Sequence, residues 1–323
     1  MKLLKLVPDN TNIHFLRWQW PFFISNILAM IGAVVLLFTH GLNLGVDFVG
    51  GQMIRATFVE SSEAPVAELR QKVGGLGYGE PIIQQFGKPN EVSIRMKLPD
   101  GAEEHAELAD AMANKITNTL KQTYPGVRID GVDSVSGKVS GELFKTGMFA
   151  LLLAMIGISI YIWVRFEWQF GVGALFALLQ DLLLTIGMFS LTQMEFDLNI
   201  VAALLTLLGY SLNDKIVVYD RIRENLKKYR KMPMPELLDL SVNETLSRTV
   251  ATSLAVLIML VALLLLGPDV IFGFTAAITL GIFVGTYSSI FMSAPILIWL
   301  GVTQSSFVPD KASDDKDGVP RNA

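Results

Sequence analysis

The chain has 323 residues, of which 51% are hydrophobic and 17% are charged, with a mean hydropathy of +0.46 and a net charge of −4. Soluble domains carry about 25% charged residues, so this composition is typical of a membrane protein, and the small net charge gives no indication of a nucleic-acid partner. The sequence contains no cysteine, which excludes disulfide bonds, thiolate metal sites and cysteine nucleophiles.

Six stretches are apolar and long enough to cross a bilayer, which takes about 20 residues. The first exceeds the apolar core of a signal peptide and is followed by no small-residue cleavage pattern, so we expect an uncleaved anchor after a tail of residues 1–20. The predicted spans are 21–39, 143–164, 170–191, 198–219, 249–267 and 270–300.

The distribution of basic residues predicts the orientation of these spans. The predicted loop 220–248 is rich in Lys and Arg, whereas the short segments at 192–197 and 267–269 contain neither. Positively charged short loops stay in the cytoplasm. We therefore expect both termini, including the tail 301–323, to be cytoplasmic, and the segment 40–142 to lie outside.

The segment 40–142, between spans one and two, has the mixture of polar and apolar residues that is typical of a soluble domain. It predicts a ferredoxin-like α+β fold in the order βαββαβ. The expected strands are 52–60, 81–86, 91–98 and 127–135, and the expected helices are 64–76 and 102–124.

Two acidic residues, Asp181 and Asp214, lie inside predicted spans. A carboxylate at that depth costs several kcal/mol unless it is paired, hydrated or protonated. Asp214 precedes Asp220, the expected end of its span, by one and a half turns, which places it about 9 Å inside the membrane. Arg248 starts the next span at a similar depth, so we expect it to pair with Asp214.

Two interpretations of this pair remain open. It is either a structural ion pair that fixes helix register or a proton relay whose carboxyl alternates between charged and neutral forms. Three polar neighbours favour the relay, because Ser211, Asn213 and Thr252 can organise water around Asp214 and Arg248.

The neighbouring Lys215 and the second acid also allow two interpretations. Lys215 either snorkels to the cytoplasmic head groups or serves as a further partner of Asp214, although consecutive helical residues point about 100° apart. Asp181 is either functional or satisfied locally by Thr185 and Gln180.

Several motifs occur in order with the expected spans between them, and together they resemble the SecD/SecF family of the resistance-nodulation-division superfamily. The similarity runs from about Phe15 to the end of the last span. Its motifs are LGVDFVGG at 44–51, RFEW at 165–168, GYSLND at 209–214, DRIREN at 220–225 and ETLSRTVATS at 244–253.

The resemblance is to SecF-type members, and it implies a non-enzymatic subunit without a cofactor in the bacterial inner membrane. Such subunits pair with SecD and assist preprotein translocation through SecYEG at the expense of the proton gradient. The resemblance further implies that Asp214 and Arg248 take part in proton movement.

The sequence departs from the family pattern at two positions. Lys215 stands where the family has a small hydroxylated residue, and Gln180 stands where some relatives have histidine before Asp181.

The GG motif after span one is expected to act as a hinge or structural motif, with a second hinge region at 137–141. Its residues of interest are Asp47, Phe48, Gly50 and Gly51.

Three other classes of protein are alternatives to this interpretation. An intramembrane enzyme is disfavoured because the spans contain no HExxH, GxSxG or paired-aspartate motif. A half-transporter for a proton-driven solute or lipid exporter of the same superfamily, and a passive scaffold for SecD, remain alternatives.

Overall fold

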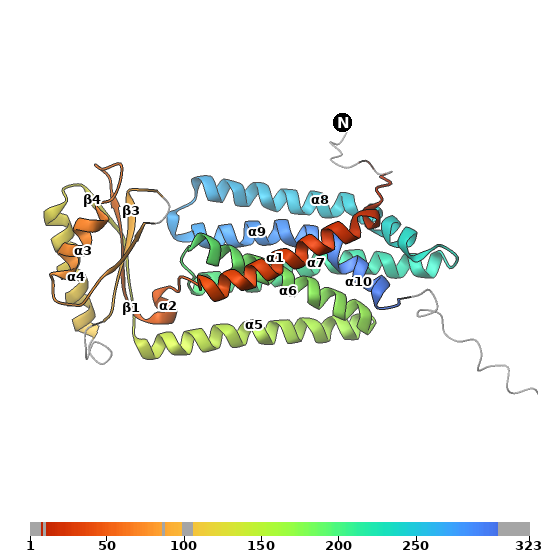
Figure 1. The fold of residues 1–323 in the computed structure, drawn as a ribbon, viewed down its shortest axis with the longest axis horizontal. Helices are drawn as coiled ribbons and strands as arrows, with labels where there is room; N and C mark the ends of the chain where they lie inside the picture. Colours follow the sequence, from red (N-terminus) through yellow and green to blue (C-terminus); the bar gives the residue numbers. More distant parts are fainter. Residues whose placement is uncertain (1–7, 9–10, 86–87, 99–105, 303–323) are drawn as a thin grey trace, which may run out of the picture.

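A four-stranded antiparallel sheet with two helices on one face forms one end of the molecule (Figure 1). The computed structural model describes residue 8 and residues 11–85, 88–98 and 106–302. The strand order is β2-β3-β1-β4, in which every neighbouring pair is antiparallel. This confirms the predicted ferredoxin-like fold. Its elements are β1 Gly51–Phe58, α3 Val66–Gly74, β2 Ile82–Gln85, β3 Glu91–Met96, α4 Ala106–Thr123 and β4 Val127–Val135.

The two faces of this sheet have different surroundings. Alternate residues of β1 and β3, including Ile54, Phe58 and Ile94, pack with α3 and α4 in a buried apolar core. Residues of the opposite parity, such as Arg55 and Arg95, lie on the other face, because side chains alternate along a strand. Figure 1 shows that this second face is turned toward the helix bundle. The first turn of the helix expected at 102–124 lies outside the described residues.

Within the described residues, six helices are long and apolar enough to span a membrane, as predicted. The sixth is interrupted by a π-helical turn. The helices are α1 Gln19–Thr39, α5 Gly137–Arg165, α6 Trp168–Thr192, α7 Leu198–Lys228, α8 Met234–Leu266, and α9 Phe272–Ser288, which continues through η3 Ser289–Ser293 into α10 Ala294–Trp299. Short helical turns occur at η1 Phe15–Trp18, α2 Val46–Val49 and η2 Asp269–Ile271.

The prediction that residues 220–248 form a loop is wrong, because most of them are helical; their placement in the cytoplasm stays a prediction. Helix α7 continues to Lys228 and α8 begins at Met234, so only residues 229–233 connect them. The basic residues hid an amphipathic pattern, since Ile222 and Leu226 of α7 pack with Leu237 of α8 in one buried cluster. The extended helices form a hairpin at the end of the bundle opposite the sheet, which we call the tail end (Figure 1).

Aromatic residues mark a membrane boundary at this tail end. All five tryptophans occur near helix ends that meet there, in η1, α1, α5, α6 and α10, and each is at least 42% exposed. Tryptophan is enriched at the membrane–water interface. At the same level, Arg165 of α5 donates a hydrogen bond of 3.1 Å to Asp220 of α7. The hairpin beyond Asp220 therefore extends outside the apolar layer.

The GG motif joins the sheet domain to the bundle. Gly50 and Gly51 have φ angles of 74° and 116°, which side chains rarely adopt. A Cβ on Gly51 would lie 2.5 Å from the Met96 carbonyl oxygen, and one on Gly50 would lie 3.1 Å from the Gly137 Cα. The two covalent connections of the domain, before β1 and after β4, therefore touch each other.

We expect Gly51→Ala to destabilise the sheet domain by about 2 kcal/mol, because the strained backbone and the close carbonyl act together. Thermal unfolding of the purified full chain in mild detergent would measure the loss. Gly141→Ala is the control, since a Cβ at Gly141 meets nothing within 4 Å. Equal unfolding temperatures for the two variants would contradict the steric argument.

Candidate functional site

A fully buried ion pair links α6 and α7 within the bundle. The Lys215 Nζ lies 2.9 Å from the Asp181 Oδ2, and the two side chains are 0% and 1% exposed. Lys215 also donates hydrogen bonds to Ser211 at 2.5 Å and to Ser288 of α9 at 3.2 Å. Ser211 in turn donates to the same Asp181 oxygen at 2.5 Å. Three oxygens thus surround one ammonium group, which is the arrangement that makes a buried charge tolerable.

The expected snorkelling of Lys215 is wrong. Its Nζ bonds to Ser211, one turn nearer the start of α7, so the side chain points away from the tail end. Helical side chains lean toward the helix N-terminus, and this lean carries the ammonium toward Asp181. Lys215 is therefore not a surface charge.

Local satisfaction of Asp181 is also wrong. The Thr185 hydroxyl donates to the Asp181 backbone carbonyl at 2.8 Å, and Gln180 donates to Asn26 of α1 at 2.6 Å. The Asp181 carboxylate instead depends on Lys215 and Ser211 from α7. A titratable neighbour therefore does accompany Asp181, although it comes from another helix.

Asp214 is buried on a different side of α7 from Lys215. It is 4% exposed, and its Oδ2 accepts no hydrogen bond from the described residues. Ser253 of α8 interacts with the carboxylate, and Lys215 and Arg248 act on it through their charges. Asp214 thus lacks the dedicated counter-ion that Asp181 has.

The predicted ion pair between Asp214 and Arg248 is not formed in this chain. Arg248 is exposed, and among the described residues no salt bridge joins the two side chains. Asn213 and Thr252 are exposed as well, and Thr252 donates to the carbonyl oxygens of its own helix. Matching depth did not determine which way Arg248 points, because depth says nothing about helix rotation.

Further polar side chains lie in the apolar layer beside the ion pair. The buried Asn26 of α1 donates to the Tyr287 hydroxyl at 3.1 Å and accepts from Gln180 at 2.6 Å. Asn26 and Tyr287 were not among the residues predicted from the sequence. The available signal was a lone asparagine in the middle of an apolar span, which needs a partner in a membrane.

The expected motif residues Asp47 and Phe48 hold the bundle end that faces the sheet. Asp47 accepts a hydrogen bond of 2.9 Å from the Leu198 backbone at the start of α7, as negative side chains at helix N-termini commonly do. Phe48 is buried and packs edge-to-face on Phe144 and against Phe196. This part of the motif is structural, and whether it acts as a hinge stays a prediction.

Two acids in the α6–α7 loop have perturbed titration. Burial raises the pKa of the Glu195 carboxyl above its ordinary value, although the Arg95 guanidinium opposes the rise. Burial likewise raises the pKa of Asp197, against hydrogen bonds from Asn199 and Ile200.

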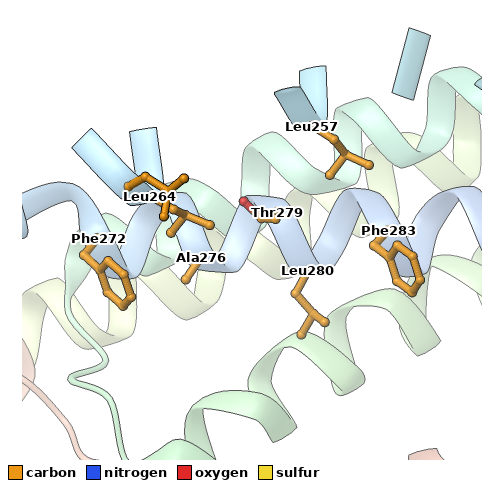
Figure 2. A pocket seen from close by; sticks show the side chains of 8 residues that line it. Leu257, Leu264, Phe272, Ala276, Thr279, Leu280 and Phe283 are labelled. Atoms are coloured by element: carbon orange, nitrogen blue, oxygen red, sulfur yellow. The ribbon is translucent and has the colours of Figure 1, made fainter. Parts of the chain in front are cut away.

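A shallow apolar cavity of about 450 Å³, open to the surface, lies between α8 and α9 (Figure 2). Its one hydroxyl, from Thr279, is engaged by the Thr275 carbonyl oxygen at 2.7 Å. The cavity therefore offers no free polar group for proton transfer. Its lining residues are Leu257, Leu264, Leu265, Phe272, Ala276, Thr279, Leu280 and Phe283.

Comparison with known proteins places the chain in a family. A profile described as "Protein export membrane protein SecD/SecF, C-terminal" matches residues 115–303, and one described as "SecD/SecF GG Motif" matches residues 35–61. The chain belongs to the SecD/SecF family. It is a multi-pass membrane protein of the SecF type. The expected resemblance is confirmed.

Its relatives are SecF proteins over nearly their whole length. It is 43% identical to protein translocase subunit SecF of Rhodobacter capsulatus, covering 98% of this chain and 99% of that protein. It is 44% identical to the SecF of Cereibacter sphaeroides, covering 98% of this chain and 97% of that protein.

Two crystal structures of SecDF are also similar. SecDF of Thermus thermophilus, a translocon-associated membrane protein, matches with a TM-score of 0.79 at 34% identity, and SecDF in a super-membrane-facing form matches with 0.65 at 35% identity. Each match covers 90% of this chain but only 39% of the SecDF chain. This chain thus spans well under half the length of those SecDF chains.

We expect Lys215→Met alone to destabilise the protein by about 3–5 kcal/mol, since it leaves Asp181 buried without a counter-ion. The double variant Lys215→Met with Asp181→Leu should recover most of the loss, because no charge remains. Thermal unfolding in detergent would test both, with Asn213→Ala as the exposed control on the same helix. A double variant as unstable as the single one would contradict the pairing.

Proposed function

We propose that this chain is the SecF subunit of the Sec export machinery. With SecD, it would use the proton motive force to assist preprotein translocation through SecYEG across the bacterial inner membrane. Support comes from family membership and from the buried Asp214, whose Oδ2 lacks a partner among the described residues. A membrane-depth carboxylate without a fixed counter-ion is a typical proton carrier.

The two membrane aspartates have different roles in this proposal. Asp181 is paired with Lys215 and accepts a hydrogen bond from the Ser211 hydroxyl, so it serves as a fixed anchor between α6 and α7. Asp214 binds and releases the proton. We had expected Asp214 and Arg248 to pair within this chain, but Arg248 is exposed.

The exposed polar residues beside Asp214 suggest where SecD binds. Arg248, Thr252 and Asn213 are exposed on α7 and α8, where a hydrocarbon environment disfavours them. A transmembrane helix of SecD covering this face would supply polar partners. Arg248 would then respond to the charge on Asp214 from within the subunit interface.

The available energy is sufficient for mechanical coupling. One charge moved through 100 mV gives about 2.3 kcal/mol, whereas inverting a 1:99 population takes about 5.5 kcal/mol. A few protons in each cycle would therefore drive a two-state movement of the sheet domain, with no covalent chemistry.

A passive scaffold for SecD is the second candidate function. The fully buried pair of Asp181 and Lys215 favours it, because such pairs commonly fix helix register. The two candidates make different predictions for Asp214. Proton coupling requires its carboxyl to bind and release a proton, whereas a scaffold does not.

We expect Asp214→Asn to abolish the gradient-dependent part of export while the complex with SecD keeps its normal abundance. Asparagine retains the shape but cannot exchange a proton at neutral pH. Inverted membrane vesicles with and without a protonophore would separate the gradient-dependent part. Asp110→Asn, on the exposed face of α4, is the control. Full gradient-dependent export by Asp214→Asn would favour the scaffold.

We expect the sheet domain to be periplasmic and the α7–α8 hairpin to be cytoplasmic. The absence of native cysteine allows single substitutions at two exposed lysines, Lys121→Cys in α4 and Lys228→Cys in α7. An impermeant maleimide applied to intact spheroplasts should label the first and spare the second. Equal labelling at both positions would contradict this orientation.

A further inference from the structure

Arg95 of β3 holds the sheet domain to the bundle through three contacts. Its Nη1 donates to the Leu44 carbonyl oxygen at 2.6 Å, and its Nη2 lies 3.4 Å from both the Asn43 Oδ1 and the Glu195 Oε1. The Arg95 side chain is only 12% exposed. It therefore bridges the segment after α1 and the loop between α6 and α7.

The two segments that Arg95 contacts are themselves joined by backbone hydrogen bonds. The Gly45 N–H donates to the Phe196 carbonyl at 2.8 Å, and the Phe196 N–H donates to the Asn43 carbonyl at 2.8 Å. Asn43 further donates to the Gln84 Oε1 of β2 at 2.9 Å. Residues 43–45 and the α6–α7 loop thus form one unit beneath the sheet.

This unit is a direct extension of the helices that carry the buried charges. The α6–α7 loop, residues 193–197, begins where α6 ends and finishes where α7 begins. Asp197 caps α7 by accepting from the Ile200 N–H at 3.1 Å, and Asp47 accepts from the Leu198 N–H. A shift of α7 along its axis therefore displaces this loop.

The covalent connections of the sheet domain do not fix its orientation relative to the bundle as the Arg95 contacts do. Both pass through glycine, at Gly50 and Gly51 before β1 and at Gly137 after β4, and they lie against each other. Acting as the predicted hinge, these two adjacent connections would allow the domain to tilt. Arg95 lies beyond this hinge, on the strand next to β1 and opposite Met53. A contact placed away from the hinge determines the tilt.

Glu195 lies in a network of charges from the sheet, the loop and α2. Arg95 and Arg55 face it from the sheet, and Asp197 and Asp47 face it from the loop and from α2. Arg55 is also engaged by Asp133 of β4 at 2.6 Å. Acids outnumber bases in this network, which makes Arg95 the shared cation that keeps the loop and sheet together.

We propose that Arg95 is the positioning residue through which α6 and α7 set the tilt of the sheet domain, with Glu195 as its partner in the α6–α7 loop. This rests on the proposed function, in which protonation of Asp214 moves these helices. In this proposal the role of Arg95 is to transmit movement from the helices to the sheet domain.

The test measures tilt and export in the complex with SecD. Spin labels at Lys121→Cys in α4 and Val270→Cys, at the bundle end near the sheet, report the domain–bundle distance. We expect Arg95→Met to broaden this distance distribution and to lower gradient-dependent export about tenfold, the equivalent of one charge-assisted hydrogen bond. Gradient-independent export and complex abundance should not change.

Glu195→Gln should have a smaller effect than Arg95→Met, because the contact between Arg95 and Leu44 remains. Arg70→Met, at an exposed position of α3, is the matched control.

A second substitution separates transmission from local stability. With Arg95 intact, Asp214→Asn should shift the label distances, and with Arg95→Met it should cause no further shift, because coupled sites are not additive. Distances and export in Arg95→Met equal to those in Arg70→Met would overturn the proposal. A failure of the proposed function gives a different result, namely full gradient-dependent export by Asp214→Asn with Arg95 intact.

Discussion

The ion pair between Asp181 and Lys215 is the interaction on which the arrangement of the bundle depends. It lies where neither charge is accessible to solvent, so each is tolerable only while the other is in place. This requirement fixes the rotation of α6 and α7 relative to each other. Helix α9 closes over the pair, since a Cβ on Gly285 would lie 2.8 Å from the Ser211 Oγ. Gly281, four residues earlier, also faces α7, since a Cβ there would clash with the Leu207 side chain, so this GxxxG spacing allows α9 to approach α7 closely.

Fixing Lys215 toward α6 places Asp214 on another side of α7, toward α8. Consecutive helical residues point about 100° apart, so Lys215 is buried against α6 and α9 while Asp214 is buried on the side of α7 that faces α8. The same rotation of α7 leaves Asn213 exposed, next to the exposed Arg248 of α8 in the polar face proposed to bind SecD.

Much of the fold could be predicted from the sequence, because hydrophobic length and strand alternation report local structure. The six spans and the βαββαβ order follow from those patterns. The extent of α7 and α8 could not be predicted from charge, since Lys and Arg on an amphipathic hairpin look like a loop until Ile222 and Leu237 are seen to pack together.

The candidate site was predictable in its residue types but not in its pairings. Asp181, Ser211 and Lys215 were all identified as unusual, yet the pairing depended on helix rotation, which one sequence does not supply. Arg248 was assigned to Asp214 by depth, and the structure turns it outward. The contact between Arg95 and the α6–α7 loop gave no local signal, because its partners are about 50 and 100 residues away along the chain.

Helix α7 is the element suited to carry a local change at Asp214 to the sheet domain. Sixteen residues separate Asp214 from Leu198, a distance of about 24 Å along the helix axis, and the helix runs through this stretch without interruption. By contrast, the sixth span passes through a π-helical turn before Pro295, and such a turn absorbs axial movement. In the proposed mechanism, a shift that starts beside Asp214 would therefore be delivered by α7 to its capped N-terminus, where Asp47 and the Arg95 contact would receive it.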